Sequence, residues 1–243
     1  MIVLMMSVVI NSAFAGNGLQ WSVVDKSVLA SELAALNKYS QHLDKYEVNI
    51  TESSYEDYYT NTYHERSEGY FKKNKNEFHS YIQGVHTIQT SDCRLVIDSS
   101  KKIIMVANPL QSLNPAFSSS GEYEILFKLC THLERANDDG KTYYKVTFSP
   151  GYAFTSYELI IKDSLVEKVI MFYSKKIKKG SEFFQPRVEI DFDNWTTKFT
   201  DRKNYFDINT VVEKKGSKYV LTQPYVGKFK FSDQRVLVKT TKK

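Results

Sequence analysis

The most informative part of this sequence runs from residue 69 to residue 109, where short apolar segments alternate with polar turns. Between residues 93 and 98, Cys93, Leu95 and Ile97 alternate with Arg94 and Asp98, which is the period-two pattern of a strand with one buried face. Residues 103–107 (IIMVA) are instead apolar at every position. A strand of that kind needs cover on both faces, from a second layer of structure or from an apolar cavity that holds a ligand.

Two segments have helical periodicity. Residues 22–43 repeat apolar positions about every 3.6 residues, which predicts an amphipathic helix that begins near Asp25 or Ser27. Residues 122–133 have apolar side chains at a similar spacing and predict a second helix. The apolar stripe of each helix must pack on the strands that follow it.

The other segments predict strands joined by turns. A Tyr-rich strand is expected to run through Tyr58, Tyr59 and Tyr63 to residue 71, and aromatic residues, 14% of the chain, favour β-structure throughout. Helices and sets of strands follow one another without βαβ alternation, which predicts an α+β fold with one curved antiparallel sheet and helices packed on one face. Further strands are expected at residues 46–50, 77–83, 85–97, 102–107, 143–148, 157–161, 167–173 and 186–195.

The first residues have the features of an export signal. Residues 2–10 are apolar, and Ala13 and Ala15 are small residues at the positions that a signal peptidase reads, although no Lys or Arg precedes the apolar run. We therefore expect a signal peptide at residues 1–15 that is cleaved after Ala15. Because no Pro/Gly/Ser-rich linker interrupts the remainder, residues 16–243 are expected to form a single domain.

Export would place the two cysteines in an oxidising compartment. Cys93 lies in a strand pattern and Cys130 in the predicted second helix. The two could form a disulfide, and two buried free thiols are the alternative, because sequence spacing does not fix the distance between their Cα atoms.

The charge pattern bears on partners. The formal net charge is +5, but the basic residues are dispersed, with small lysine clusters at residues 175–179 and 239–243. A nucleic-acid-binding protein is expected to have a denser basic face with interleaved aromatic residues, so no nucleic-acid partner is predicted. Weak attraction to an anionic membrane, and thus peripheral membrane contact at most, fits this pattern.

No motif of catalysis, metal binding or cofactor binding is present. The sequence lacks a G-x-S-x-G nucleophile elbow, a phosphate-binding glycine loop and the histidine pairs of zinc sites. Glu189, Asp191 and Asp193 share one strand face, where a solvated polar surface explains them better than a calcium site. We predict no enzyme activity, no catalytic residues, no metal and no cofactor. The five histidines are expected to be isolated surface or half-buried residues: His42, His64, His79, His86 and His132.

The apolar surface exceeds what a single-layer sheet can hide. Part of it is therefore expected to line a cavity between the sheet and the helices, and a hydrocarbon chain would bind there through the area that it removes from water, without a polar motif. The residues expected to line this ligand-binding cavity are Leu33, Leu36, Tyr70, Tyr81, Leu95, Ile97, Ile103, Met105, Leu126 and Leu129.

Several segments together resemble the periplasmic outer-membrane lipoprotein-carrier superfamily, most closely its divergent, Bacteroidetes-type members. The resemblance lies in the Gly-Tyr-Phe-Lys-Lys strand end at residues 69–73, in Thr90-Ser91-Asp92 before the strand at residues 94–98, and in the strand at residues 103–106. Cys93, Cys130 and the tail after Trp195 fall outside the family pattern.

The resemblance implies an open half-barrel with helices on its concave face, which binds a lipid or lipoprotein acyl chain without catalysis. It also implies a periplasmic carrier or chaperone that takes part in transport. The alternative function is a structural or interaction module of the cell envelope, with a protein partner in assembly or secretion and no bound lipid.

Overall fold

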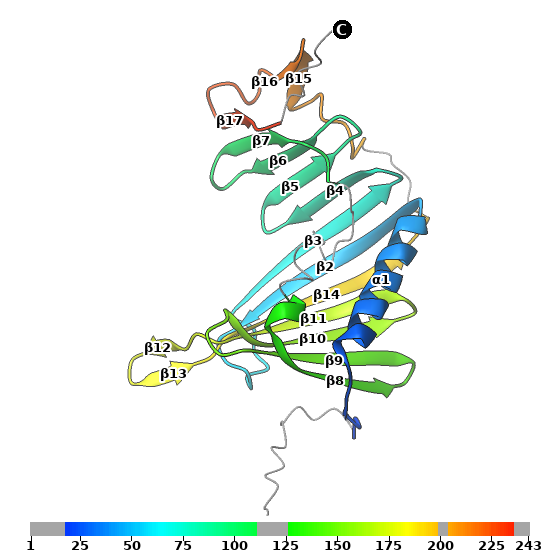
Figure 1. Cartoon of the computed structure of the whole chain (residues 1–243). Coiled ribbons are helices and arrows are strands. Elements are labelled where there is room, and N and C mark those ends of the chain that lie inside the picture. The colour runs from blue at the N-terminus through cyan, green and yellow to red at the C-terminus, as the bar shows by residue number, and fades with distance from the viewer. Residues whose placement is uncertain (1–17, 111–125, 199–203, 236–243) are drawn as a thin grey trace, which may run out of the picture.

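The computed structural model describes residues 18–110, 126–198 and 204–235, and everything below refers to these residues. The fold is mostly β, with one large open sheet of 13 strands in the order β1-β8-β9-β10-β11-β14-β2-β3-β4-β5-β6-β7-β17, and two small hairpins, β12-β13 and β15-β16 (Figure 1). The elements are β1 (Ser22–Val23), α1 (Lys26–His42), β2 (Lys45–Tyr55), β3 (Glu65–Asn74), β4 (Glu77–Ile82), β5 (Val85–Gln89), β6 (Arg94–Asp98), β7 (Ile103–Ala107), β8 (Cys130–Asp138), β9 (Lys141–Phe148), β10 (Phe154–Lys162), β11 (Leu165–Tyr173), β12 (Ile177–Lys179), β13 (Glu182–Phe184), β14 (Arg187–Thr196), β15 (Val212–Lys215), β16 (Lys218–Leu221) and β17 (Lys230–Asp233).

Helix α1 forms where its periodicity predicts. Asp25 caps its N-terminus, because the Asp25 side chain accepts a hydrogen bond of 2.8 Å from the backbone N–H of Ser27. Leu29, Leu33 and Leu36 recur along one side and are buried against the sheet. Burial of a leucine side chain contributes about 1.5–3 kcal/mol, so these three residues hold the helix in place.

Lys73 ties the C-terminal end of α1 to β3. Its buried Nζ donates to the backbone oxygens of Ser40, Gln41 and Leu43 at 2.9, 3.3 and 2.8 Å. Carbonyl groups at a helix C-terminus carry partial negative charge and favour a cation there. Burial lowers the pKa of Lys73.

The strand register assigns each residue to one face of the sheet. Phe71 packs with α1 in one hydrophobic cluster, and residues paired across adjacent strands share its face: Ser80, Thr87, Val96 and Met105 in succession. We call this side the helix face. The side chains that alternate with them lie on the opposite, reverse face: Ile88, Leu95, Ile97, Ile104 and Val106.

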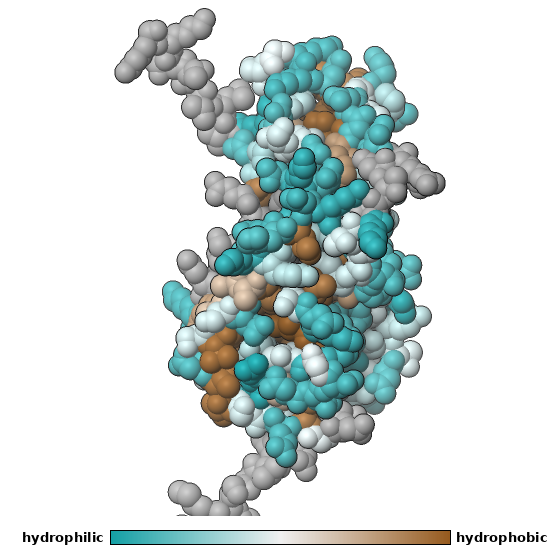
Figure 2. Space-filling model, turned by 90° about the vertical axis from the view of Figure 1, so that its right-hand side faces the viewer, coloured by the Kyte–Doolittle hydropathy of each residue, from teal (hydrophilic) through white to brown (hydrophobic). Residues whose placement is uncertain are grey.

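Two hydrophobic clusters cover different faces in different parts of the sheet. The larger lies on the helix face under α1 and includes residues of α1, β2, β3, β8, β9, β10 and β14. The smaller lies on the reverse face, where β5, β6 and β7 pack against residues 208–231 of the C-terminal segment. The molecule accordingly has a larger lower part and a smaller upper part with a narrower waist between them (Figures 1 and 2).

Gly69 allows a close approach between β3 and β4. A Cβ atom built on Gly69 would lie 2.1 Å from the backbone oxygen of Tyr81. Beyond the pair Tyr70–Tyr81, β3 continues without β4 as a partner. The missing side chain at residue 69 therefore permits the end of β4 to cross β3.

Most predicted strands are confirmed, and three predictions are wrong. Of the predicted second helix, residues 122–125 lie outside the described residues and residues 126–129 are helical, but Cys130 begins β8, so residues 130–133 are strand. Tyr58, Tyr59 and Tyr63 lie in the loop between β2 and β3 and not in a strand. The sheet is mixed and not purely antiparallel, because β17 pairs with β7 in parallel.

The contact at Gly69 gives a prediction for stability. Substitution Gly69→Ala should lower the free energy of unfolding by more than about 2 kcal/mol, because the new methyl group would collide with backbone and not with a flexible side chain. Ser67→Ala, on the same strand and face, should change it by about 0.5 kcal/mol or less. Chemical denaturation of the two variants measures both values; equal unfolding midpoints would show that the crossing does not depend on glycine.

Candidate functional site

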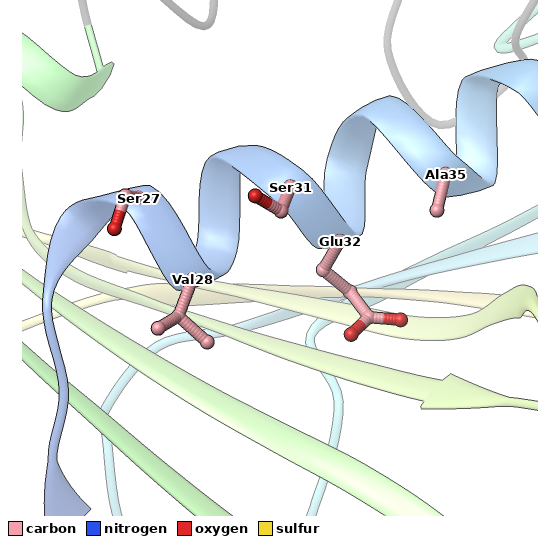
Figure 3. Close-up of a pocket in the computed structure, with 5 residues that line it drawn as sticks. All are labelled: Ser27, Val28, Ser31, Glu32 and Ala35. Atoms are coloured by element: carbon pink, nitrogen blue, oxygen red, sulfur yellow. The ribbon is translucent and has the colours of Figure 1, made fainter.

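A groove of about 440 Å³ opens beside α1, lined by Ser27, Val28, Ser31, Glu32 and Ala35. Its volume is within the range of roughly 300–1,000 Å³ typical of small-molecule sites. The side chains of Val28 and Glu32 point from the helix toward the sheet (Figure 3). Val28 also packs on the helix-face cluster, so the groove borders the main core.

The groove has polar contacts at its edges. The hydroxyl group of Tyr144, a fully buried residue of β9, donates to Glu32 Oε2 at 3.4 Å. The Nζ atom of Lys26 donates to the backbone oxygen of Phe127 at 2.9 Å, which joins the start of α1 to the helical turn at residues 126–129. An occupant of the groove would therefore meet the apolar side chains of Val28 and Ala35 beside the Glu32 carboxylate and the hydroxyl groups of two serines.

The ten residues predicted to line one cavity are not brought together. Leu33, Leu36, Leu126 and Leu129 all belong to the helix-face cluster under α1, the first two fully buried and the other two partly buried. They belong to the core on which Val28 packs, but none of them lines the groove.

The remaining six residues lie elsewhere. Leu95 and Ile97 are buried on the reverse face under the C-terminal segment. Ile103 and Met105 lie on the helix face of β7, where Ile103 is 38% exposed. The first pair lies on the reverse face and the second on the helix face, so the four residues cannot line one cavity. Tyr70 and Tyr81 line a second groove, described next.

The second groove, of about 530 Å³, lies where β14, β2, β3 and the end of β4 meet. Tyr70 and Tyr81 form its aromatic wall, with ring centroids 6.0 Å apart. The register places Tyr70 opposite Asn49 and Asn49 opposite Asp193, so these three side chains share the reverse face. Its full lining is Asn49, Ile50, Thr51, Arg66, Glu68, Gly69, Tyr70, Tyr81, Asp193 and Asn194.

Two histidines beside this groove form a pair that the sequence analysis missed. His79 Nε2 lies 3.1 Å from His86 Nδ1 and 3.4 Å from the hydroxyl oxygen of Tyr70. Burial, together with the nearby His86 and Lys72, lowers the pKa of His79 to about 4, and burial also lowers the pKa of His86. Both rings are therefore neutral near pH 7. The turn at Gln83 and Gly84 was the available signal, because a hairpin there brings residues 79 and 86 close together.

In the acidic row of β14, Glu189 and Asp191 are paired with cations, whereas Asp193 is exposed. Glu189 is buried and accepts hydrogen bonds from Arg187 Nε at 2.8 Å and Lys168 Nζ at 2.7 Å. Lys168 also lies 3.0 Å from Asp191. These partners lower the pKa of Glu189 although burial itself opposes that change. Within the ranges that the structure describes, no group of three or more metal-binding side chains forms.

Cys93 and Cys130 are both free thiols and both buried. Cys93 belongs to the reverse-face cluster and Cys130 to the helix-face cluster. The free-thiol alternative is therefore the one that the structure has, and burial raises the pKa of the Cys130 thiol.

The expected signal peptide at residues 1–15 lies outside the described residues. Of the helices in the described ranges, none is long and apolar enough to cross a bilayer. Neither a protein-family model nor a curated protein matches the chain.

The histidine pair predicts a pH dependence of stability. His79 has a lower pKa folded, about 4, than in an unfolded chain, about 6.5, so the unfolded chain binds more protons between these values. The stability contributed by neutral His79 is full above about pH 6.5 and is lost as the pH falls toward 4.

Denaturant unfolding between pH 7 and 4.5 measures this contribution. In His79→Gln the decline of stability with falling pH should be shallower than in the unmodified protein. His132→Gln, which removes an exposed imidazole, should keep the original slope. Identical slopes in both variants would contradict the assignment to His79.

Proposed function

We propose that this chain is a non-enzymatic, periplasmic carrier or binding protein that holds a lipid or lipoprotein acyl chain on the helix face. The observation that carries the proposal is the groove beside α1, whose Val28 is continuous with the main apolar cluster. A hydrocarbon chain there would gain about 0.8 kcal/mol for each methylene group removed from water. The proposal includes export, with cleavage after Ala15.

The connection between β7 and β8 supports this location. At its start, Leu110 exchanges two hydrogen bonds with the buried side chain of Gln89 on β5, at 2.7 and 3.1 Å. At its end, the turn at residues 126–129 packs on the helix-face cluster. Leu110 and the turn at residues 126–129 thus both lie on the helix face, the side on which α1 packs.

We propose further that the sheet acts as an open half-barrel with the helix face as its concave side. Gln83, in the turn between β4 and β5, donates to the Glu52 carboxylate of β2 at 2.5 Å. Glu52 pairs with Ile190, whose side chain packs on the helix-face cluster, so the Gln83 turn leans toward that face. A turn displaced toward the helix face favours a sheet that curves around α1.

The second candidate function is an interaction module of the cell envelope without a bound lipid. It is favoured by the packing of β6 and β7, where Leu95, Ile104 and Val106 are completely buried under the C-terminal segment. The C-terminal segment of the chain covers that part of the apolar surface, so no ligand is needed to cover it. A protein partner, and not an acyl chain, would then account for the function.

Lipid content decides between the two functions. Native mass spectrometry and organic extraction of protein purified from cells should find a bound lipid. Ala35→Phe would fill the groove and should reduce the bound fraction severalfold. Ala34→Phe is the matched control: Ala34 is exposed on the same helix but does not line the groove, so lipid content should be unchanged.

Three outcomes of this experiment are informative. Equal lipid loss in both variants, with thermal unfolding unaltered, would remove the groove from the proposal. Repeated absence of any lipid from the unmodified protein would reject the carrier function. A specific envelope protein recovered by cross-linking of that lipid-free protein would support the interaction module.

A further inference from the structure

The β12-β13 hairpin extends beyond the sheet at the end opposite α1 (Figure 1). It belongs to the connection between β11 and β14, two strands that pair directly with each other. Its residues from 175 to 183 are all exposed. The hairpin therefore contributes little to the cores, and its composition is not dictated by packing.

The hairpin combines exposed apolar side chains with lysines. Phe183 is 63% exposed and Ile177 is 46% exposed. Glu182 is the one acidic residue between residues 174 and 186, against four lysines at positions 175, 176, 178 and 179. Lys178 is paired with Phe183 across the hairpin, and its Nζ lies 5.9 Å from the Phe183 ring centroid.

A second segment contributes to the same end of the molecule. The loop at residues 56–64 between β2 and β3 has Tyr59 74% exposed and Tyr63 51% exposed. Its Glu56 carboxylate forms an ion pair with Lys179. The Asp57 side chain accepts a hydrogen bond from the backbone N–H of Gln185, which follows the hairpin, at 3.4 Å. We call the hairpin and this loop together the aromatic–lysine tip.

Arg187 holds the tip on the sheet. Its buried guanidinium donates to the backbone oxygens of Asp57, Tyr58 and Thr60 at 3.0, 2.9 and 2.8 Å. The guanidinium also lies 3.8 Å from the ring centroid of Tyr55. The Tyr58 hydroxyl oxygen lies 2.8 Å from Thr155 Oγ1, which joins the loop to β10. The exposed aromatic residues are thus carried by a well-supported base.

From this surface we infer that the tip docks on an anionic phospholipid bilayer. Phenylalanine and isoleucine enter the boundary between headgroups and acyl chains, tyrosine rings lie at the headgroup level, and lysines attract anionic headgroups. The hairpin projects from the body and can reach a flat surface before the sheet does. Phe183 and Lys178 share one face of the hairpin, and Ile177 lies on the other face. The tip has four lysines against three carboxylates, and Lys179 is paired with Glu56, so it is the lysine cluster at residues 175–178 that favours an anionic occupant. The exposed apolar side chains favour an occupant with an apolar interior.

This inference is independent of the proposed acyl-chain site, which lies beside α1. The tip can bind a bilayer whether or not the groove is occupied, and each proposal is tested with a different variant.

The experiment uses the full chain and vesicles of phosphatidylcholine with about one third phosphatidylglycerol. Cosedimentation should detect binding to these vesicles and much weaker binding to pure phosphatidylcholine. At about 1 M salt, where the Debye length is about 3 Å, binding should fall strongly.

Two pairs of variants locate the contact. Phe183→Ser should weaken binding roughly tenfold, since a phenyl ring no longer leaves water. Val226→Ser removes an apolar side chain outside the tip that is 52% exposed, and it should have no effect. Lys176→Glu with Lys178→Glu should abolish binding, while Lys218→Glu with Lys228→Glu, the same charge change on exposed residues of the C-terminal segment, should leave most of it.

Unchanged circular dichroism and thermal unfolding would establish that the tip variants fold. The inference is overturned if the unmodified protein does not bind anionic vesicles, or if it binds pure phosphatidylcholine equally well. It is also overturned if the tip variants bind as well as their controls, or if Phe183 mediates only self-association or contact with another protein.

Discussion

The need to cover both apolar faces of a single sheet is the constraint on which this structure depends. The larger cluster is closed on the helix face by α1, through Leu29, Leu33 and Leu36. The smaller is closed on the reverse face by the C-terminal segment, through residues such as Val212 and Tyr219. Because the covers lie on opposite faces, one sheet has two separate cores, and the space for a ligand is confined to what each cover leaves open.

Local periodicity was sufficient to predict the elements whose neighbours are close in sequence. The cap at Asp25, the stripe of α1 and the presence of a strand at β14 could all be derived from the chain, whereas the burial of Arg187 and Glu189 on β14 could not. Residues 122–133 misled because Leu126, Leu129 and Leu133 have helical spacing, whereas tertiary pairing with β9 makes the end of that segment a strand. Pairing between distant segments, such as β17 with β7, leaves no local signal.

The candidate site was predictable only in part, for the same reason. The leucines of α1 and of residues 126–129 come together, since each lies on an apolar helical stripe. Leu95 and Ile103 were predicted to line the same cavity because β7 is apolar on both faces. The sequence does not show which face packs against α1 and which against the C-terminal segment. The partners of His79 required the hairpin register, and those of Glu189 required the order of β11, β14 and β2.

Buried polar side chains fix the segments that the apolar clusters do not hold. Lys73 fixes the end of α1, and Arg187 fixes the loop at residues 56–64 while its charge is balanced by Glu189. Buried charges of this kind are costly unless fully bonded, so their partners restrict the chain to one arrangement. The proposed binding surfaces are built on these supports, with the groove at α1 and the tip beyond Arg187.

The central claim is that the two clusters stabilise different parts of one sheet. Hydrogen exchange measured by mass spectrometry on Leu33→Ala tests it most directly, because this substitution in a core costs about 2–5 kcal/mol. Exchange should become faster in α1, β2, β9 and β10 and stay unchanged in β5, β6 and β7. An equal acceleration in β5 to β7 would contradict it, since the sheet would then depend on a single core.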